Sequence, residues 1–289
     1  MEIFYYYERA RLHLCNSNLY CSDEDYEKLV SKGKIDKYRV DILNSLQKYQ
    51  VLTIQMLMVL LKREKEELSS DLQSLMEYGL IIKQFYVYFD EDIEERSATF
   101  YCVSPRLPRK MQLKDKKNDF CWSKDLFMPD VMGILAFNQF HLAFIENIPK
   151  KAYQTQLQYH LRGATIDGRY ILKGKHFHLG YSHLCVHAIR DFGHKNAEAV
   201  ELMQKIYHTC TYQGDKQPWF IFICEHKRQC AYIDRKVRSN PETRNIRVYF
   251  LLDTDFAYNE NPLQYLQTYR FMNGEKEVTS EVFKVDEWF

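Results

Sequence analysis

The sequence predicts a two-domain protein of mixed class, α+β in its first part and α/β in its second. Two observations lead to this expectation. Apolar residues recur at helical spacing between residues 36 and 78, and helices alternate with short apolar strands between residues 153 and 252. The chain has 289 residues, and at roughly 100–200 residues per domain this length favours two domains.

Composition excludes several classes of protein. Lysine and arginine number 40 against 39 acidic residues, so no overall charge attracts nucleic acid or membrane, and such a partner must meet a local patch. Hydrophobic residues make up 46% of the chain, which argues against overall disorder. No uncharged apolar run reaches about 18 residues, and the acidic start is unlike a signal peptide. The 8 dispersed cysteines indicate reduced thiols, so we expect a cytoplasmic protein with no membrane partner.

The first 104 residues are predicted to hold four helices and a hairpin. Residues 1–35 form an irregular N-terminal extension with one short helix, for which Ser22 is the N-cap. Three helices follow, the first over 36–48, the second capped by Thr53 and the third over 65–78. Gly79 then ends the third helix, and strands over 80–89 and 98–103 flank an acidic turn at 90–95.

Three helices followed by a hairpin is the order of a winged helix. The phrase Leu75-Met76-Glu77-Tyr78-Gly79-Leu80-Ile81 resembles the L-x-x-x-G-L-I junction at which the third helix of such domains meets the wing. This resemblance assigns residues 36–104 to a winged-helix domain. Prolines and cations then mark residues 105–127 as a basic linker.

Residues 128–289 are predicted to form the α/β domain. A helix over 128–147 precedes three strands, at 153–160, 164–172 and 183–191. The order continues with a helix over 196–212, a strand over 218–224, a helix over 226–238 and a strand over 246–252, and an acidic segment, 253–289, ends the chain.

The order αβββαβ resembles the restriction-endonuclease-like, or PD-(D/E)XK, fold. A winged helix joined to such a domain resembles the replication-relaxation type of protein from bacterial plasmids and conjugative elements. This resemblance covers residues 36–252 and implies a role on the DNA of a mobile element.

The nuclease motif that this fold implies is incomplete. The family's chemistry needs an aspartate on the second strand, then an acid and a lysine two residues apart on the third, to hold Mg²⁺ and position water. Asp167 occupies the first position, but the strand 183–191 has no acid-x-lysine pair. If Arg190 replaces the lysine, Ala188 stands at the acid position. If His187 replaces the acid, Ile189 stands at the lysine position. We therefore expect no nuclease activity. Asp167 is the only catalytic candidate, and a turn residue beside Gly168 is its simpler interpretation.

A group of histidines offers a second possible site. If two strands paired as a hairpin, they would bring together four histidines and one cysteine, which are ligands that zinc accepts: His176, His178, His183, Cys185 and His187. Hydrogen-bonded strand histidines are the simpler interpretation, so we predict no metal. The chain also lacks phosphate-binding glycine loops, so we predict no cofactor.

Charge placement indicates which surfaces could meet DNA. The third helix and the wing tip are acidic, which weighs against DNA contact there and suits protein binding or self-association. Two stretches are basic instead: Arg106, Arg109 and Lys110 in the linker, and Lys227, Arg228, Arg235, Lys236 and Arg238 in the predicted helix 226–238. For the second stretch, a solvated helix face is the alternative interpretation.

The leading hypothesis is a non-enzymatic, DNA-associated accessory protein of a plasmid or conjugative element, acting in replication, mobilisation or regulation. The acidic wing motivates an alternative, a protein-interaction or assembly module without DNA contact. A metal-dependent nuclease or hydrolase that uses Asp167 and the histidines is the third hypothesis.

Overall fold

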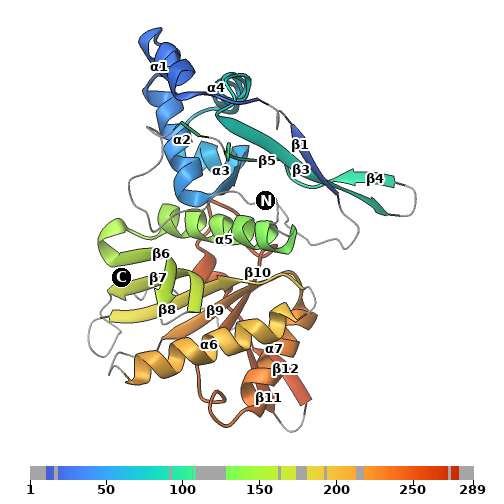
Figure 1. The fold of residues 1–289 in the computed structure, drawn as a ribbon. Helices are drawn as coiled ribbons and strands as arrows, with labels where there is room; N and C mark the ends of the chain where they lie inside the picture. The colour runs from blue at the N-terminus through green and yellow to red at the C-terminus, as the bar shows by residue number, and fades with distance from the viewer. Residues whose placement is uncertain are drawn as a thin grey trace. The chain divides into compact units, whose positions relative to one another are not determined.

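In the computed structural model, the chain divides into two compact units, Tyr7–Val131 and Met132–Phe289, hereafter the N-terminal and C-terminal units. Both contain helices and sheets, so the protein belongs to the mixed α and β class (Figure 1). The structure describes residues 11–15, 19–90, 93–105, 107–108, 128–161, 164–173, 181–191, 194–212, 218–272 and 275–279.

The N-terminal unit places short helices against an antiparallel sheet. Its helices are α1 (Asp23–Ser31), α2 (Lys37–Tyr49), α3 (Ile54–Leu61) and α4 (Lys65–Glu77). Its strands are β1 (Arg11–Cys15), β2 (Val51–Thr53), β3 (Ile81–Asp90), β4 (Ile93–Arg96) and β5 (Phe100–Val103), in the sheet order β1-β3-β5-β2, and β4 also pairs with β3.

The helix signals in the first unit are confirmed. The hydroxyls of Ser22 and Thr53 accept the backbone N–H groups of Asp25 and Met56, so both residues are N-caps. Gly79 follows α4 with a φ of +70°, the left-handed conformation that a glycine after a helix usually takes.

Several details of the first unit differ from the prediction, among them the strand β2 between α2 and α3, which the sequence did not predict. The extension 1–35 contains β1, which pairs antiparallel with β3, where the sequence predicted no strand. The acidic turn predicted at 90–95 is also shorter, because Ile93–Arg96 pair with Val87–Asp90 of β3. Backbone pairing satisfies N–H and C=O groups whatever the charge of the side chains, so the hairpin continues into the acidic segment.

The C-terminal unit is built around a five-stranded sheet of order β10-β9-β8-β7-β6. The strands are β6 (Tyr153–Leu161), β7 (Ala164–Lys173), β8 (Tyr181–Ala188), β9 (Trp219–Cys224) and β10 (Val248–Leu252). Strands β6, β7 and β8 form an antiparallel meander, and β8, β9 and β10 run parallel.

Helices cover both faces of this sheet (Figure 1). On one face lies α5 (Met128–Asn147), whose Phe140 and Phe144 pack against Tyr170 of β7. On the other lie α6 (Lys195–Tyr212) and α7 (Lys227–Ser239), whose apolar sides join one buried cluster with β8, β9 and β10. The remaining elements are the 3₁₀ turns η3 (Lys150–Ala152) and η4 (Pro262–Tyr265), and a small hairpin of β11 (Thr268–Met272) and β12 (Glu275–Thr279).

Candidate nucleic-acid interface

The helix α7 presents a basic surface from a rigid position. Cys230, Ile233 and Val237 recur at i, i+3 and i+7 and are buried in the cluster with β9 and β10. This spacing places one stripe of the helix in the core and leaves the opposite stripe to solvent.

Side chains at both ends of α7 hold the helix in place. At the start, Nδ1 of His226 accepts the N–H of Gln229 at 3.1 Å, and Nε2 lies 2.8 Å from Asp191. Because Nδ1 accepts, the ring proton is on Nε2 and faces the Asp191 carboxylate. At the end, the Thr243 hydroxyl donates to the carbonyl of Val237 at 2.7 Å. These contacts fix both ends of the helix that carries the basic surface.

The exposed side of α7 carries cations and one aromatic ring. Lys227, Arg228, Arg235 and Lys236 are all exposed. Among the residues that the structure describes, no ion pair reaches the guanidinium of Arg228 or Arg235. The only acid in the helix, Asp234, is fully buried, so α7 adds no negative charge to this side. We call Lys227, Arg228, Tyr232, Arg235 and Lys236 the α7 basic face.

Arg238, the remaining cation predicted on this helix to contact nucleic acid, has a structural role instead. Its guanidinium donates to the backbone carbonyls of Arg244 and Ile246 and lies 3.4 Å from the buried carboxylate of Asp234. It therefore ties the end of α7 to the segment before β10. Arg106, Arg109 and Lys110 of the predicted linker lie outside the described residues.

Asp167 lies inside the strand β7, so its interpretation as a turn residue is wrong. Its Oδ2 accepts the N–H of Ala188 at 2.7 Å and lies 2.9 Å from Nδ1 of His187. The carboxylate thus takes the place of a backbone partner where β8 ends. Position alone misled the prediction, because a glycine neighbour marks strand irregularities as well as turns.

Arg190, considered above as the substitute for the catalytic lysine, is buried. The predicted strand 183–191 ends at Ala188, and Arg190 turns inward to lie 2.6 Å from Oδ2 of Asp253, with side chains 1% and 0% exposed. Burial raises the pKa of Asp253, and the Arg190 guanidinium opposes that rise. Arg190 therefore holds the ends of β8 and β10 together.

The histidines considered above as a possible metal site do not come together in the described part of the chain. His183 is buried, and its Nδ1 lies 2.8 Å from Arg169, whereas His187 pairs with Asp167. Cys185 is buried, and burial raises the pKa of its thiol. His176 and His178 lie outside the described residues, and within those residues no group of three or more metal-binding side chains occurs.

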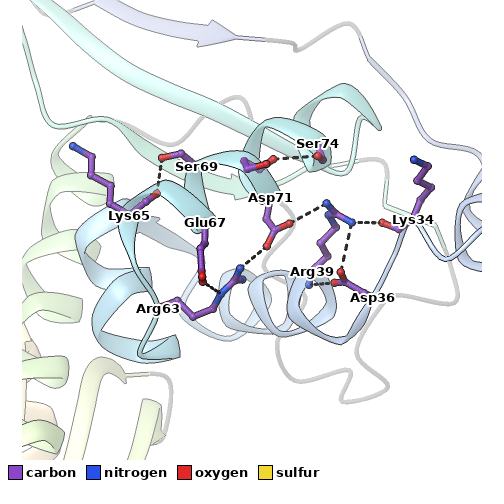
Figure 2. Close-up of polar contacts among 10 residues, drawn as sticks. Lys34, Asp36, Arg39, Arg63, Lys65, Glu67, Ser69, Asp71 and Ser74 are labelled. Atoms are coloured by element: carbon purple, nitrogen blue, oxygen red, sulfur yellow. Dashed lines mark hydrogen bonds and ion pairs between the residues drawn. The ribbon is translucent and has the colours of Figure 1, made fainter.

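In the N-terminal unit, a carboxylate on the acidic helix α4 is already neutralised. Asp71 lies between two arginines, 3.0 Å from Nη2 of Arg39 on α2 and 2.8 Å from Nη2 of Arg63 before α4 (Figure 2). Arg63 also lies 3.3 Å from Glu67, and Arg39 donates to the carbonyl of Lys34. These two arginines therefore serve the packing of the helices.

Sequence reasoning missed Tyr232. The signal was present, because Tyr232 stands four residues from both Arg228 and Lys236 and so shares their side of the helix. The polar contacts of Asp191 and His226 at the start of α7 were missed as well, since their residues lie 35 positions apart in the chain.

Comparison of this chain with known protein families, curated proteins and solved structures returns no match. Within the described residues, no helix combines the length and the apolar character needed to cross a membrane.

Proposed function

We propose that this protein is a non-enzymatic, DNA-associated accessory protein of a plasmid or conjugative element, acting in its replication, mobilisation or regulation. In this proposal residues 36–104 are a winged helix and residues 128–289 a degenerate restriction-endonuclease-like domain.

The order of elements supports both domain assignments. In the first domain, α2, α3 and α4 precede the antiparallel strands β3 and β5, and β2 adds a third strand between the helices. In the second, α5 precedes the antiparallel meander β6-β7-β8, and α6 leads to β9, parallel to β8. This is the αβββαβ order of the endonuclease-like fold, and α7 with β10 extends it.

The α7 basic face is the observation that carries the proposal of DNA contact. Clustered cations neutralise phosphates and release counterions, which supplies most non-specific affinity for DNA. The burial of Arg190 in its pair with Asp253 supports the absence of nuclease activity, since this side chain cannot replace the missing catalytic lysine.

Charge reversal on α7 tests the proposal. We expect Arg235→Glu/Lys236→Glu to weaken binding of a labelled DNA duplex and to lower the salt slope by about two units, one for each phosphate that is no longer neutralised. Fluorescence anisotropy over a salt series measures both effects. Lys150→Glu/Lys151→Glu, an exposed pair on η3, is the matched control with the same change of charge. Equal effects of the two double variants, or no binding by the wild type at low salt, contradict the proposal.

A protein-interaction role for the N-terminal unit is the second candidate. Leu19, Tyr20, Val30 and Tyr38 are large apolar side chains, each more than 40% exposed, and α1 buries none of its residues. Exposed apolar groups of this kind mark interaction surfaces when they lie together. Pull-down from a host lysate with and without nuclease treatment separates the two candidates, because a direct protein partner stays bound after the nucleic acid is digested.

A further inference from the structure

The aromatic ring at the centre of the α7 basic face suggests which form of nucleic acid it binds. Tyr232 is 40% exposed, on the side of the helix opposite its buried stripe. Its neighbours at helical spacing are Arg228, four residues before, and Lys236, four residues after. An exposed ring flanked by cations is the arrangement that proteins use to bind unpaired nucleotides.

Lys236 lies against the Tyr232 ring. Its Nζ lies over the Tyr232 ring, 5.6 Å from the centroid, at cation–π distance. One ring face therefore meets a cation, and a stacked base would lie on the other. Arg228 and Arg235 lie on the same side of the helix and can reach phosphates before and after that base.

We propose that the α7 basic face binds single-stranded nucleic acid, with one base stacked on Tyr232 and phosphates held by Arg228, Arg235 and Lys236. The inference rests on the proposed function, and it specifies single strands as the form of nucleic acid that is bound. A base inside a duplex has both faces covered by its neighbours, so Tyr232 has nothing to stack on there. A single strand offers every base to an aromatic ring.

Electrostatics alone would give the opposite preference. Duplex DNA carries one charge per about 1.7 Å of its axis, more than a single strand, so a purely cationic surface prefers the duplex. Tighter binding to the single strand therefore requires contact with the bases, and the ring of Tyr232 is the aromatic group on this face that can provide it.

The experiment uses the full chain and three fluorescent probes of about 12 nucleotides, a length within the usual site sizes for single strands. The probes are an oligothymidylate, the same length of duplex DNA, and an abasic strand with the same backbone. We expect the oligothymidylate to bind more tightly than either of the others. Tyr232→Ala should weaken its binding roughly 5- to 150-fold, the loss of one stacked base. Binding to the abasic strand should change little.

Tyr232→Phe is the matched variant, because it keeps the ring and removes only the hydroxyl. Affinity close to that of the wild type supports stacking, and a loss equal to that of Tyr232→Ala contradicts it. Circular dichroism verifies that both variants fold, as expected for an exposed side chain. If the duplex binds as well as the single strand, the inference fails and the proposed function stands. If neither form binds at low salt, both fail.

Discussion

Gly79 forms the connection between the end of α4 and the start of β3. Its φ of +70° is one reason for glycine, and the space around it is the other: a Cβ there would lie 2.8 Å from the backbone nitrogen of Tyr20. Such a close approach to backbone requires the chain to shift. The sequence predicts the backbone conformation, and the close approach of the segment before α1 is visible only in the fold.

We expect Gly79→Val to destabilise the N-terminal unit by more than the about 1–2 kcal/mol that a left-handed conformation costs a residue with a side chain. Gly33→Val is the control, because Gly33 has a φ of +66° but no atom within 4 Å of the added Cβ. Urea unfolding of the full chain compares the two. Equal losses would mean that the approach to Tyr20 adds nothing to the conformational cost.

Helices α2 and α4 are joined by the carboxylate of Asp71, which contacts Arg39 on one side and Arg63 on the other (Figure 2). The three side chains are 11–18% exposed, so water screens them only in part. Without the carboxylate, two guanidinium groups would face each other across the packed helices. The pairing accounts for an acidic residue on the buried side of α4.

Asp71→Asn should lower the free energy of unfolding of the N-terminal unit by about 1–3 kcal/mol, somewhat less than the loss of one partner of a fully buried pair. Glu67→Gln removes a charge of the same sign from the same helix, but its side chain is 62% exposed, so its loss should stay below about 1 kcal/mol. Chemical denaturation of both variants measures the difference. A larger effect of Glu67→Gln would show that Asp71 does not join the helices.

The molecule as a whole consists of two compact units, and the ends of the C-terminal strands are held by the buried pair of Arg190 and Asp253. Arg190→Met leaves the Asp253 carboxylate without its partner, so we expect a loss of about 3–5 kcal/mol in the free energy of unfolding, measured by chemical denaturation. Arg190→Met/Asp253→Leu should regain most of it, because the double variant leaves no unpaired charge at this position. Failure of the second substitution to restore stability would contradict the role of the pair.

The same variant has a predictable dependence on pH. Burial raises the pKa of Asp253, and removing Arg190 takes away the group that opposes this rise. A carboxyl whose pKa is higher in the folded than in the unfolded state favours folding when protonated, and this contribution is lost as pH rises through the folded-state pKa. The deficit of Arg190→Met should therefore shrink on acidification. The Arg190→Met substitution should leave the unfolding of the N-terminal unit unchanged. The losses in free energy of unfolding caused by Gly79→Val and by Arg190→Met should therefore add in the double variant.

Local signals in the sequence predicted much of this protein. Ser22, Thr53 and Gly79 mark helix ends through bonds and dihedral angles that depend only on near neighbours, and the apolar runs at 218–224 and 246–252 predicted β9 and β10. The tertiary structure alone decided which polar groups meet across the chain. The strand β1 is formed by its pairing with β3. Arg190 can be buried because it forms an ion pair with Asp253, which lies 63 residues away in the sequence. Helical spacing predicted which cations lie on α7. Only the fold shows that Asp234 is buried and that Arg238 is bound to the segment before β10, so that the other cations face solvent. Caps and periodicity act over a few residues, whereas burial and long-range pairing depend on elements that are distant in sequence.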